Sequence, residues 1–253
     1  MCIVLYDLPS TSPGCSMSFN TWRTRRLHIR SKRYCLNYKG LPFITEWVEF
    51  PDICHLYSKL GIAPNATKAD GSPHYTLPVI YDPATNVVIH DSLAIAEYLD
   101  KQYPHTPQVF PHNTTGLTQV FTEAAMSYMP PARNLLLWTI FLCLNPPSAQ
   151  FFRDDIESMV GKKLEDLVPD DQLSENMNAF QGVLGRIDIL YAKNGGHGAY
   201  IMGDELSWAD IVIASLLMCF RVSAGEDSQK WKEIISWHDG RWTILMESMR
   251  RYE

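Results

Sequence analysis

The stretch that decides the fold begins with Leu77-Pro78-Val79-Ile80-Tyr81. A short turn leads from this run to Val87-Val88-Ile89-His90, and Asp91-Ser92 follow directly. Both runs are rich in β-branched and aromatic residues, which is typical of strands. The turn between them, Asp82 to Asn86, has the length of a hairpin connection, so we expect the two strands to pair. Asp91-Ser92 then places helix-capping side chains before an apolar periodic segment. The stretch predicts a β-hairpin that continues directly into a helix.

Alternating strand and helix patterns precede this hairpin. Ile3 to Leu8 predicts a short buried strand that Pro9 ends. The segments that follow predict a helix over Thr21–Tyr38, a strand over Phe43–Phe50, a helix over Asp52–Leu60 and a polar loop over Gly61–Tyr75. Together with the hairpin, they give the order β-α-β-α-β-β-α within residues 1–105.

The remainder of the chain has helical patterns only. Residues 106–116 are rich in Pro, His and Thr and predict a linker, and residues 117–253 predict an all-helical domain. Apolar positions from Met177 to Tyr191 predict one amphipathic helix that Gly195-Gly196 ends. Ser207 to Ala224 is apolar on nearly all sides, which predicts a helix buried within the domain. An α/β half followed by an all-helical half indicates two domains.

Composition excludes several classes of protein. The 253 residues are 46% hydrophobic and 20% charged, with a formal net charge of −6, so neither global disorder nor general nucleic-acid binding is indicated. No apolar run is long enough for a membrane span, and Met1 to Asp7 lacks the features of an export signal, so we expect a cytoplasmic protein. The six cysteines are scattered, which predicts reduced thiols and no metal site.

Pro78 is the first of three polar or irregular features that point to a ligand. A proline cannot donate to a sheet ladder, and an interior strand normally excludes it. If the bond before Pro78 is cis, the main-chain N–H and C=O of Leu77 are turned outward and can pair with an extended peptide. An ordinary edge-strand proline is the alternative interpretation.

Asp91-Ser92 and Ser18-Phe19-Asn20 are the other two features. The N–H groups at a helix N-terminus favour a carboxylate, the Ser92 hydroxyl adds a donor, and Asp91 could pair with an α-ammonium group. This arrangement suits the α-amino-acid end of a γ-glutamyl group, although a plain N-cap also explains it. Ser18 and Asn20 would place a hydroxyl and an amide donor where they could lower the pKa of a thiol, and here too an N-cap is the alternative.

The combination of these features resembles a glutathione transferase, and the detailed sequence resembles the fungal group related to bacterial β-etherases. The resemblance rests on the following runs: Ile3-Val4-Leu5-Tyr6-Asp7-Leu8-Pro9-Ser10, Asn20-Thr21-Trp22-Arg23, Leu36-Asn37-Tyr38-Lys39-Gly40-Leu41-Pro42, Trp47-Val48-Glu49, Pro51-Asp52-Ile53 and Gly71 to Pro83. It implies a thioredoxin-like first domain that binds glutathione, a helical second domain and a homodimer. It also implies a hydrophobic aromatic ligand between the domains.

The resemblance also implies roles for particular residues. Ser18 and Asn20 would contact the glutathione sulfur, the Leu77 main chain before Pro78 would pair with the peptide, and Asp91 and Ser92 would hold the γ-glutamyl end. The function implied is a glutathione transferase that conjugates or reduces hydrophobic and aromatic electrophiles.

Two departures from the family pattern support alternative functions. Phe19 stands where relatives have proline, and Arg26 to Arg33 inserts a basic segment of about two helical turns at 3.6 residues per turn. A non-catalytic ligandin that carries aromatic metabolites such as polyphenols is therefore one alternative, and a regulatory protein is another. Cys15 is a second candidate nucleophile. We also expect Tyr128, Met129, Arg133, Trp138 and Phe141 to lie on the first long helix of the second domain and to be candidates for the cleft.

Overall fold

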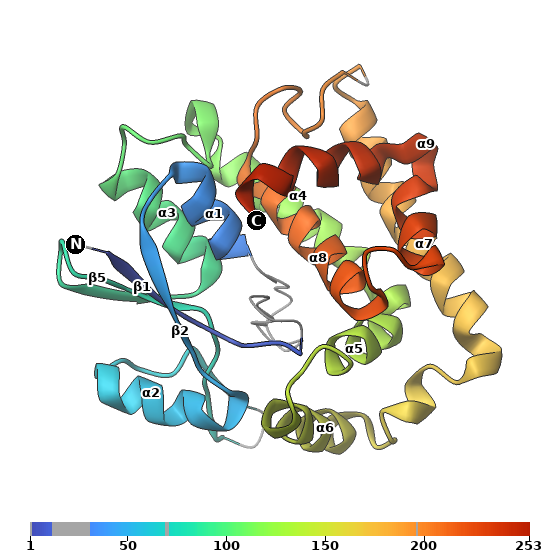
Figure 1. The fold of residues 1–253 in the computed structure, drawn as a ribbon, viewed down its shortest axis with the longest axis horizontal. Coiled ribbons are helices and arrows are strands. Elements are labelled where there is room, and N and C mark those ends of the chain that lie inside the picture. Colours follow the sequence, from blue (N-terminus) through green and yellow to red (C-terminus); the bar gives the residue numbers. More distant parts are fainter. Residues whose placement is uncertain (1, 12–30, 69–70, 196) are drawn as a thin grey trace.

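The computed structural model describes residues 2–11, 31–68, 71–195 and 197–253, and in it an α/β half precedes an all-helical half (Figure 1). The strands are β1 (Ile3–Asp7), β2 (Phe43–Trp47), β3 (Ala66–Thr67), β4 (Pro73–His74), β5 (Val79–Asp82) and β6 (Val87–His90). The helices are α1 (Ser31–Lys39), α2 (Ile53–Leu60), α3 (Ser92–Gln102), α4 (Thr115–Ser127), α5 (Arg133–Phe141), α6 (Pro146–Val160), α7 (Leu173–Ala192), α8 (Trp208–Ala224) and α9 (Gln229–Met249). The predicted order of the two classes of structure is confirmed.

The first half is built on a mixed four-stranded sheet in the order β2-β1-β5-β6. β1 and β2 are parallel, which requires a crossover connection, and α1 lies within that connection. β5 pairs with β1 and β6 in antiparallel register, with Leu5 opposite Ile80, so the predicted hairpin is confirmed. Helices α1 and α3 cover one face of the sheet and α2 covers the other (Figure 1). Strand β2 ends at Trp47, earlier than the predicted Phe50.

The segment between α2 and β5, predicted as an irregular polar loop, contains a small ladder. β3 pairs with β4 in antiparallel register, with Ala66 opposite His74. The Asn65 N–H donates to the His74 carbonyl over 2.9 Å and extends the ladder by one bond. Two-residue strands are too short to show a period of two, which is why the sequence pattern did not reveal them.

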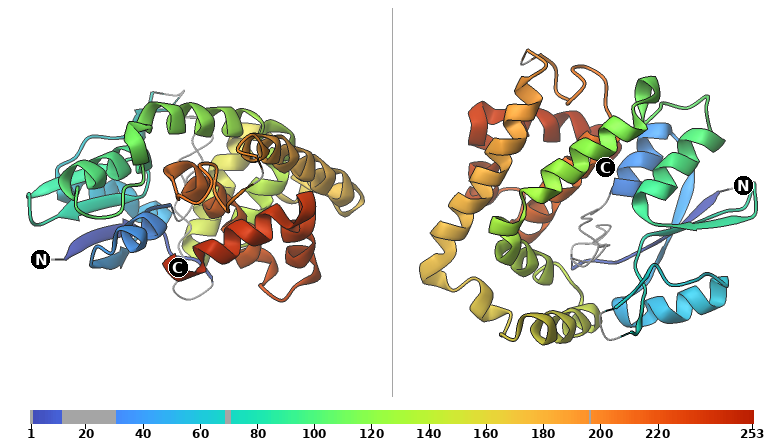
Figure 2. Two further views of the ribbon diagram at one scale, coloured as in Figure 1. Left: turned by 90° about the horizontal axis from the view of Figure 1, so that it is seen from above. Right: turned by 180° about the vertical axis from the view of Figure 1, so that it is seen from behind.

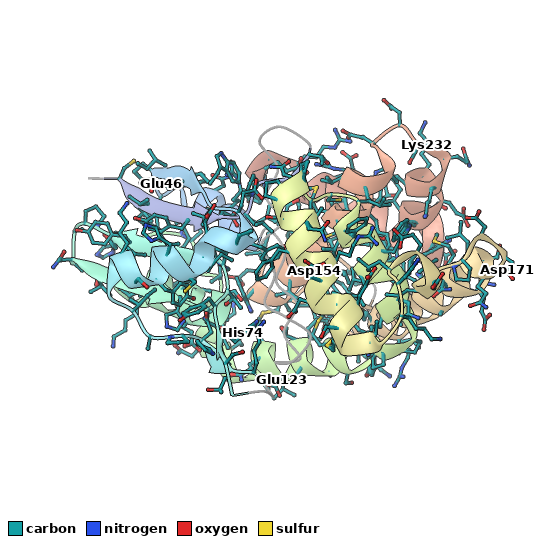
Figure 3. The ribbon with its side chains drawn as sticks, turned by 90° about the horizontal axis from the view of Figure 1, so that it is seen from below. Glu46, His74, Glu123, Asp154, Asp171 and Lys232 are labelled. Atoms are coloured by element: carbon teal, nitrogen blue, oxygen red, sulfur yellow. The ribbon has the colours of Figure 1, made fainter. Side chains whose placement is uncertain are left out.

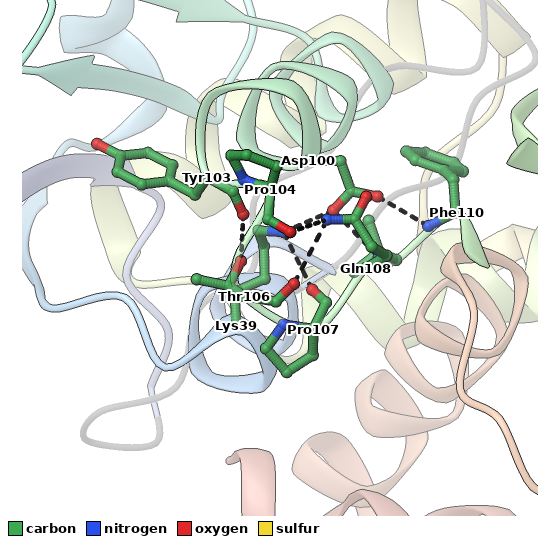
Figure 4. A network of polar contacts seen from close by, with 9 residues as sticks. Lys39, Asp100, Tyr103, Pro104, Thr106, Pro107, Gln108 and Phe110 are labelled. Carbon is green, nitrogen blue, oxygen red and sulfur yellow. Dashed lines mark hydrogen bonds and ion pairs between the residues drawn. The ribbon is translucent and has the colours of Figure 1, made fainter. Parts of the chain in front are cut away.

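The linker after α3 is anchored by a buried ion pair. The Lys39 ammonium lies 2.6 Å from the Asp100 carboxylate and also donates to the Pro107 carbonyl over 3.0 Å (Figure 4). Asp100 accepts further hydrogen bonds from the N–H groups of Val109 and Phe110. A buried charge is tolerated only when it is paired and hydrogen-bonded, and both conditions are met here. The linker is therefore fixed to α1 and α3 along this stretch.

Helix α8 is the centre of the second half. Every residue from Trp208 to Phe220 is buried, as predicted from its uniformly apolar sequence. The Trp208 N–H donates to the Val109 carbonyl over 2.7 Å, which joins the start of the helix to the anchored linker. Even so, the ranges that the structure describes contain no helix that is long and apolar enough to cross a membrane.

The predicted first long helix of the second half is wrong. α4 ends at Ser127, a single 3-10 turn follows at Pro130–Ala132, and α5 begins at Arg133. A proline inside a helix removes one hydrogen bond and clashes with the preceding turn, so Pro130-Pro131 separates the two helices. The candidate cleft residues Tyr128, Met129, Arg133, Trp138 and Phe141 are thus divided between the end of α4, this turn and α5.

The predicted amphipathic helix is α7, which ends at Ala192. Gly195, one of the two glycines expected to end it, adopts a φ of 74° three positions further on. Gly196 lies outside the described residues.

The two halves lie side by side (Figure 2). Polar groups join them where α6 meets the segment that follows β2. The Glu49 carboxylate accepts hydrogen bonds from the Asn145 amide over 2.9 Å and from the Ser148 hydroxyl, at the N-terminus of α6. The Ser148 oxygen in turn accepts from the Phe50 N–H over 2.8 Å. A carboxylate at this end of a helix is favoured by the helix dipole.

A second set of contacts joins α1 to the C-terminal region of the described chain. The Asn37 amide donates to the Tyr252 carbonyl over 3.0 Å, and the Tyr38 and Tyr252 rings pack edge to face at 5.3 Å. The side chain of Arg221 on α8 pairs with Glu253. The first domain therefore contacts the second at both ends of their interface.

Candidate functional site

The Leu77–Pro78 peptide bond is cis, as the sequence suggested. Leu77 itself is buried, and β5 begins only at Val79. Among the described residues, no hydrogen bond uses the main-chain N–H or C=O of Leu77. A main-chain segment next to a sheet with unused donor and acceptor groups can pair with an extended peptide.

The sheet register brings Asp91 and Ser92 to the same edge as Leu77. Val79 lies opposite His90 in the β5–β6 pair, so Leu77 enters the sheet where Asp91 leaves it. Asp91 is the N-cap of α3, and its Oδ1 accepts from the N–H groups of Leu93 over 3.0 Å and Ala94 over 3.3 Å. The cap interpretation of Asp91 is thus confirmed.

Asp91 also has an unusual backbone. Its φ of 72° and ψ of 134° lie outside the regions that a residue with a Cβ prefers. A conformation of this kind costs on the order of 1–3 kcal/mol and is commonly found at functional sites. The strained residue stands directly before Ser92.

The Ser92 hydroxyl is the clearest sign of a missing partner. Ser92 is 0% exposed, and its Oγ has no hydrogen-bond partner among the described residues. Buried polar side chains nearly always have a partner, so an orphaned hydroxyl at a helix N-terminus calls for one. A carboxylate would suit it, because the dipole of α3 favours negative charge at the same point.

These features together match a peptide that ends in a free α-amino acid. Ser92 and the N-terminus of α3 suit its carboxylate, Asp91 suits its ammonium group, and the unused main chain of Leu77 suits a following peptide unit. The residues present therefore fit the γ-glutamyl and cysteinyl parts of glutathione.

A network of side chains that the sequence did not reveal lies behind this edge. The Asn65 Oδ1 accepts from the Thr76 N–H over 2.9 Å, and its Nδ2 lies 2.8 Å from His90 Nδ1. The Tyr57 hydroxyl contacts Asn65 Oδ1 and lies 2.8 Å from the Thr76 carbonyl. Burial raises the pKa of Tyr57 to about 12, so its phenol remains a hydrogen-bond donor.

The predicted sulfur-binding residues, Ser18 and Asn20, lie outside the described residues, as do Phe19 and Cys15. Of the free cysteines that the structure describes, three are buried, one is half-buried and one is exposed. No group of His, Cys, Asp or Glu in the described part of the chain is arranged to hold a metal ion.

One residue of the basic segment is described in full. The Arg33 guanidinium lies 5.5 Å from the ring centroids of both Phe43 and Trp47 and donates to the Thr45 hydroxyl over 2.9 Å. Arg33 therefore packs along β2, where its cation contacts aromatic faces.

Comparisons with known proteins agree with this geometry. Residues 32–102 match the family model described as the N-terminal domain of glutathione S-transferase, and residues 116–252 match the C-terminal domain model. The chain is 29% identical to the glutathione S-transferase-like protein ustS of Aspergillus flavus, over 95% of this chain and 87% of that protein.

Solved structures of fungal transferases are similar over the full length. Glutathione transferase GSTFuA3 of Phanerochaete chrysosporium is 38% identical, with a TM-score of 0.86 over 100% of this chain and 98% of that one. The glutathione S-transferase CsGST63524 of Ceriporiopsis subvermispora, solved in complex with glutathione, is 36% identical, with a TM-score of 0.88 and the same coverage. The first half is thus a thioredoxin-like glutathione transferase domain and the second is the all-helical one, and the chain belongs to the glutathione transferase superfamily.

Proposed function

We propose that this protein is a glutathione transferase that binds glutathione at the edge of the sheet between Leu77 and Ser92. It conjugates or reduces hydrophobic and aromatic electrophiles. The single observation that carries the binding proposal is the buried, unpartnered Ser92 hydroxyl at the N-terminus of α3. Solved relatives that bind glutathione support it from outside the chain.

Each binding residue has a distinct task in this proposal. The N–H and C=O of Leu77, which no described residue bonds, pair with the cysteinyl main chain. The Ser92 hydroxyl donates to the γ-glutamyl carboxylate, and the dipole of α3 adds to the attraction. Asp91 accepts from the α-ammonium group with the same carboxylate that caps the helix.

Ser18 and Asn20 are proposed as the catalytic residues on the strength of the family resemblance. Bound glutathione would supply the sulfur nucleophile. A hydroxyl and an amide that donate to the sulfur stabilise its ionised form and lower the pKa of the thiol. The protein then contributes positioning and electrostatic stabilisation, with no covalent protein intermediate.

Calorimetric titration tests the binding part. We expect wild-type protein to bind glutathione about tenfold or more tightly than cysteinylglycine, which lacks the group that Ser92 and Asp91 would hold. Equal affinities for the two peptides would contradict the proposed site.

Thiolate absorbance and turnover test the catalytic part. The Ser18→Ala variant is expected to raise the pKa of the bound thiol and to lower turnover with an isothiocyanate, an aromatic halide or a hydroperoxide. Wild-type protein that binds glutathione but turns over none of these electrophiles would contradict catalysis and leave binding intact.

A carrier of aromatic metabolites is the second candidate function, and a separate cavity favours it. The cavity is open to solvent, and its volume of about 390 Å³ suits a small organic ligand. Three tyrosine rings, two carboxylates and a guanidinium line it together with two apolar side chains: Tyr38, Tyr200, Met202, Asp204, Glu205, Leu206, Arg251 and Tyr252. Burial raises the pKa of Tyr38 to about 12, so this phenol stays protonated as a donor.

Thermal-shift measurements separate the two functions. Stabilisation by a polyphenol that persists in saturating glutathione, and that Tyr38→Ala abolishes, would support a carrier site in this cavity. Stabilisation by glutathione alone would support the transferase.

Several finer predictions belong to the same proposal. They are a homodimer, a cytoplasmic location, no nucleic-acid partner and membership of the fungal group related to bacterial β-etherases. We also propose that residues 1–105 form the first domain, residues 106–116 the linker and residues 117–253 the second domain.

A further inference from the structure

Asn65 stands where two parts of the proposed glutathione site meet. Its side chain bonds to the N–H of Thr76, the residue before Leu77, and to the ring of His90, the residue before Asp91. These partners are 11 and 25 residues away in the sequence. One amide group therefore connects the peptide-pairing segment to the helix corner.

The loop that carries Asn65 is itself held at both sides. The Asn65 N–H donates to the His74 carbonyl in the small β3–β4 ladder. Lys68, in the same loop, pairs with Asp155 on α6 at 3.0 Å. Figure 3 shows His74 and Asp154 near the middle of the molecule, with Glu46 and Asp171 towards its two ends. The amide is thus presented by a segment that is fixed at the junction of the two halves.

The partners of Asn65 determine which way its amide faces. The Thr76 N–H is a donor and can bond only to the oxygen of the amide, so the Asn65 NH2 group must face His90. An amide NH2 donates and does not accept, so the Nδ1 atom of His90 must accept. His90 is therefore assigned as neutral, with its proton on Nε2.

The Tyr57 hydroxyl completes the arrangement. It lies against both the amide oxygen of Asn65 and the carbonyl of Thr76, and it remains protonated because burial raises its pKa to about 12. The Tyr57 ring also lies 5.8 Å from the His90 ring, centroid to centroid. All four residues therefore restrict one another's orientation.

We propose that Asn65 is a positioning residue that sets the spacing between the Leu77 main chain and the Asp91-Ser92 corner, and with it the affinity for the γ-glutamyl-cysteinyl unit. This inference rests on the proposed function, because it concerns the same site. Asn65 touches no part of the ligand in this scheme and acts through Thr76 and His90. A residue of this kind is effective because the groups that bind a ligand must be held to within about 0.5 Å of the productive geometry.

Substitution of Asn65 gives the first test. Asn65→Leu removes both bonds and is expected to weaken glutathione binding about tenfold or more by calorimetry. Asn65→Asp keeps an acceptor for the Thr76 N–H and is expected to retain more affinity than Asn65→Leu. Asn37→Leu is the matched control, since Asn37 also bonds a distant partner but lies on α1, and it should leave the affinity unchanged.

The ring of His90 gives a second test that does not depend on how the Leu variant folds. Nitrogen-15 NMR of the wild-type protein is expected to show His90 with its proton on Nε2. In Asn65→Asp the carboxylate accepts only, so the ring is expected to change to the form with a proton on Nδ1.

The outcomes separate this inference from the proposed function. Wild-type protein that does not bind glutathione would contradict the proposed function itself. Wild-type protein that binds, together with an Asn65→Leu affinity within twofold of wild type or a wild-type His90 protonated on Nδ1, would overturn the positioning role alone.

Discussion

The N-termini of α8 and α3 both carry a serine and an aspartate, but the two pairs have different roles. At α8 the N–H and hydroxyl of Ser207 both donate to Asp210 Oδ2, over 2.9 and 2.7 Å. The other oxygen of Asp210 accepts from the Tyr191 hydroxyl over 2.8 Å and the Ile201 N–H over 2.7 Å. Ser207 and Asp210 are fully buried, and the surrounding groups supply every bond that the carboxylate can use.

At α3 the capping is divided differently. Asp91 bonds to the first N–H groups of the helix from a backbone conformation with a φ of 72°. Ser92 is equally buried, but its hydroxyl has no partner among the described residues. A closed set of hydrogen bonds, in which every group is paired, stabilises a fold, whereas an unpaired hydroxyl such as that of Ser92 can bond to a ligand. The residue types alone do not distinguish the two cases.

Breaking the closed set should have the largest effect. Asp210→Ala leaves four donors without their acceptor and should lower the free energy of unfolding by about 3–5 kcal/mol, measured by chemical denaturation. Asp204→Ala, an exposed carboxylate in the preceding loop, is the control and should change it by less than about 0.5 kcal/mol. A change below about 1 kcal/mol in Asp210→Ala would show that the start of α8 is not a closed network.

The two serines provide the direct comparison. Ser207→Ala should lower the free energy of unfolding by about 1–2 kcal/mol and leave glutathione affinity unchanged. Ser92→Ala should leave stability unchanged or slightly higher, because it removes an unpaired buried hydroxyl, while glutathione affinity falls about tenfold.

These two variants serve as controls for each other. If Ser92→Ala lost as much stability as Ser207→Ala, the Ser92 hydroxyl would have a partner within the protein. If Ser92→Ala bound glutathione as tightly as wild type, the site would not use this hydroxyl.

An exposed ion pair gives a third and smaller reference. Glu165 forms two hydrogen bonds with Arg153, of 2.6 and 2.9 Å, and these bonds lower the pKa of Glu165 to about 2. Because the pKa is lower in the folded state, the pair stabilises the protein above the ordinary pKa of about 4.5, and this contribution is lost as pH falls from there towards 2. Solvent screening limits it to less than about 1 kcal/mol.

The measurement compares wild type with Glu165→Gln by denaturation at pH 7, 4.5 and 3.5. The difference in unfolding free energy should shrink as the pH falls and should also shrink in high salt at pH 7. A difference that grows on acidification would contradict the assigned direction of the pKa shift.

Local signals in the sequence predicted much of the fold. The β5–β6 hairpin and the cap at Asp91 both depend on residues within a few positions of one another. Their chemistry is therefore visible in the sequence itself. The break between α4 and α5 also has a local signal in the sequence, Pro130-Pro131, which the prediction of one long helix ignored.

Distant contacts could not be predicted in the same way. Asn65 lies in a segment without periodicity, and its partners come from α2, the entry to β5 and the end of β6. Lys39 and Asp100, which fix the linker, are 61 residues apart. Such pairs follow from the topology and leave no local pattern, whereas Ser18 and Asn20 stay predictions because they lie outside the described residues.

The contact between Asn37 and Tyr252 bears on how the protein is made. Helix α1 belongs to the domain that is synthesised first, yet one of its side chains bonds to a carbonyl 215 residues further along the chain. A domain generally folds as it emerges from the ribosome, and contacts of long sequence separation form late. The first domain therefore emerges with this face of α1 uncovered, and it acquires its last partner only when translation has reached the far end of the second.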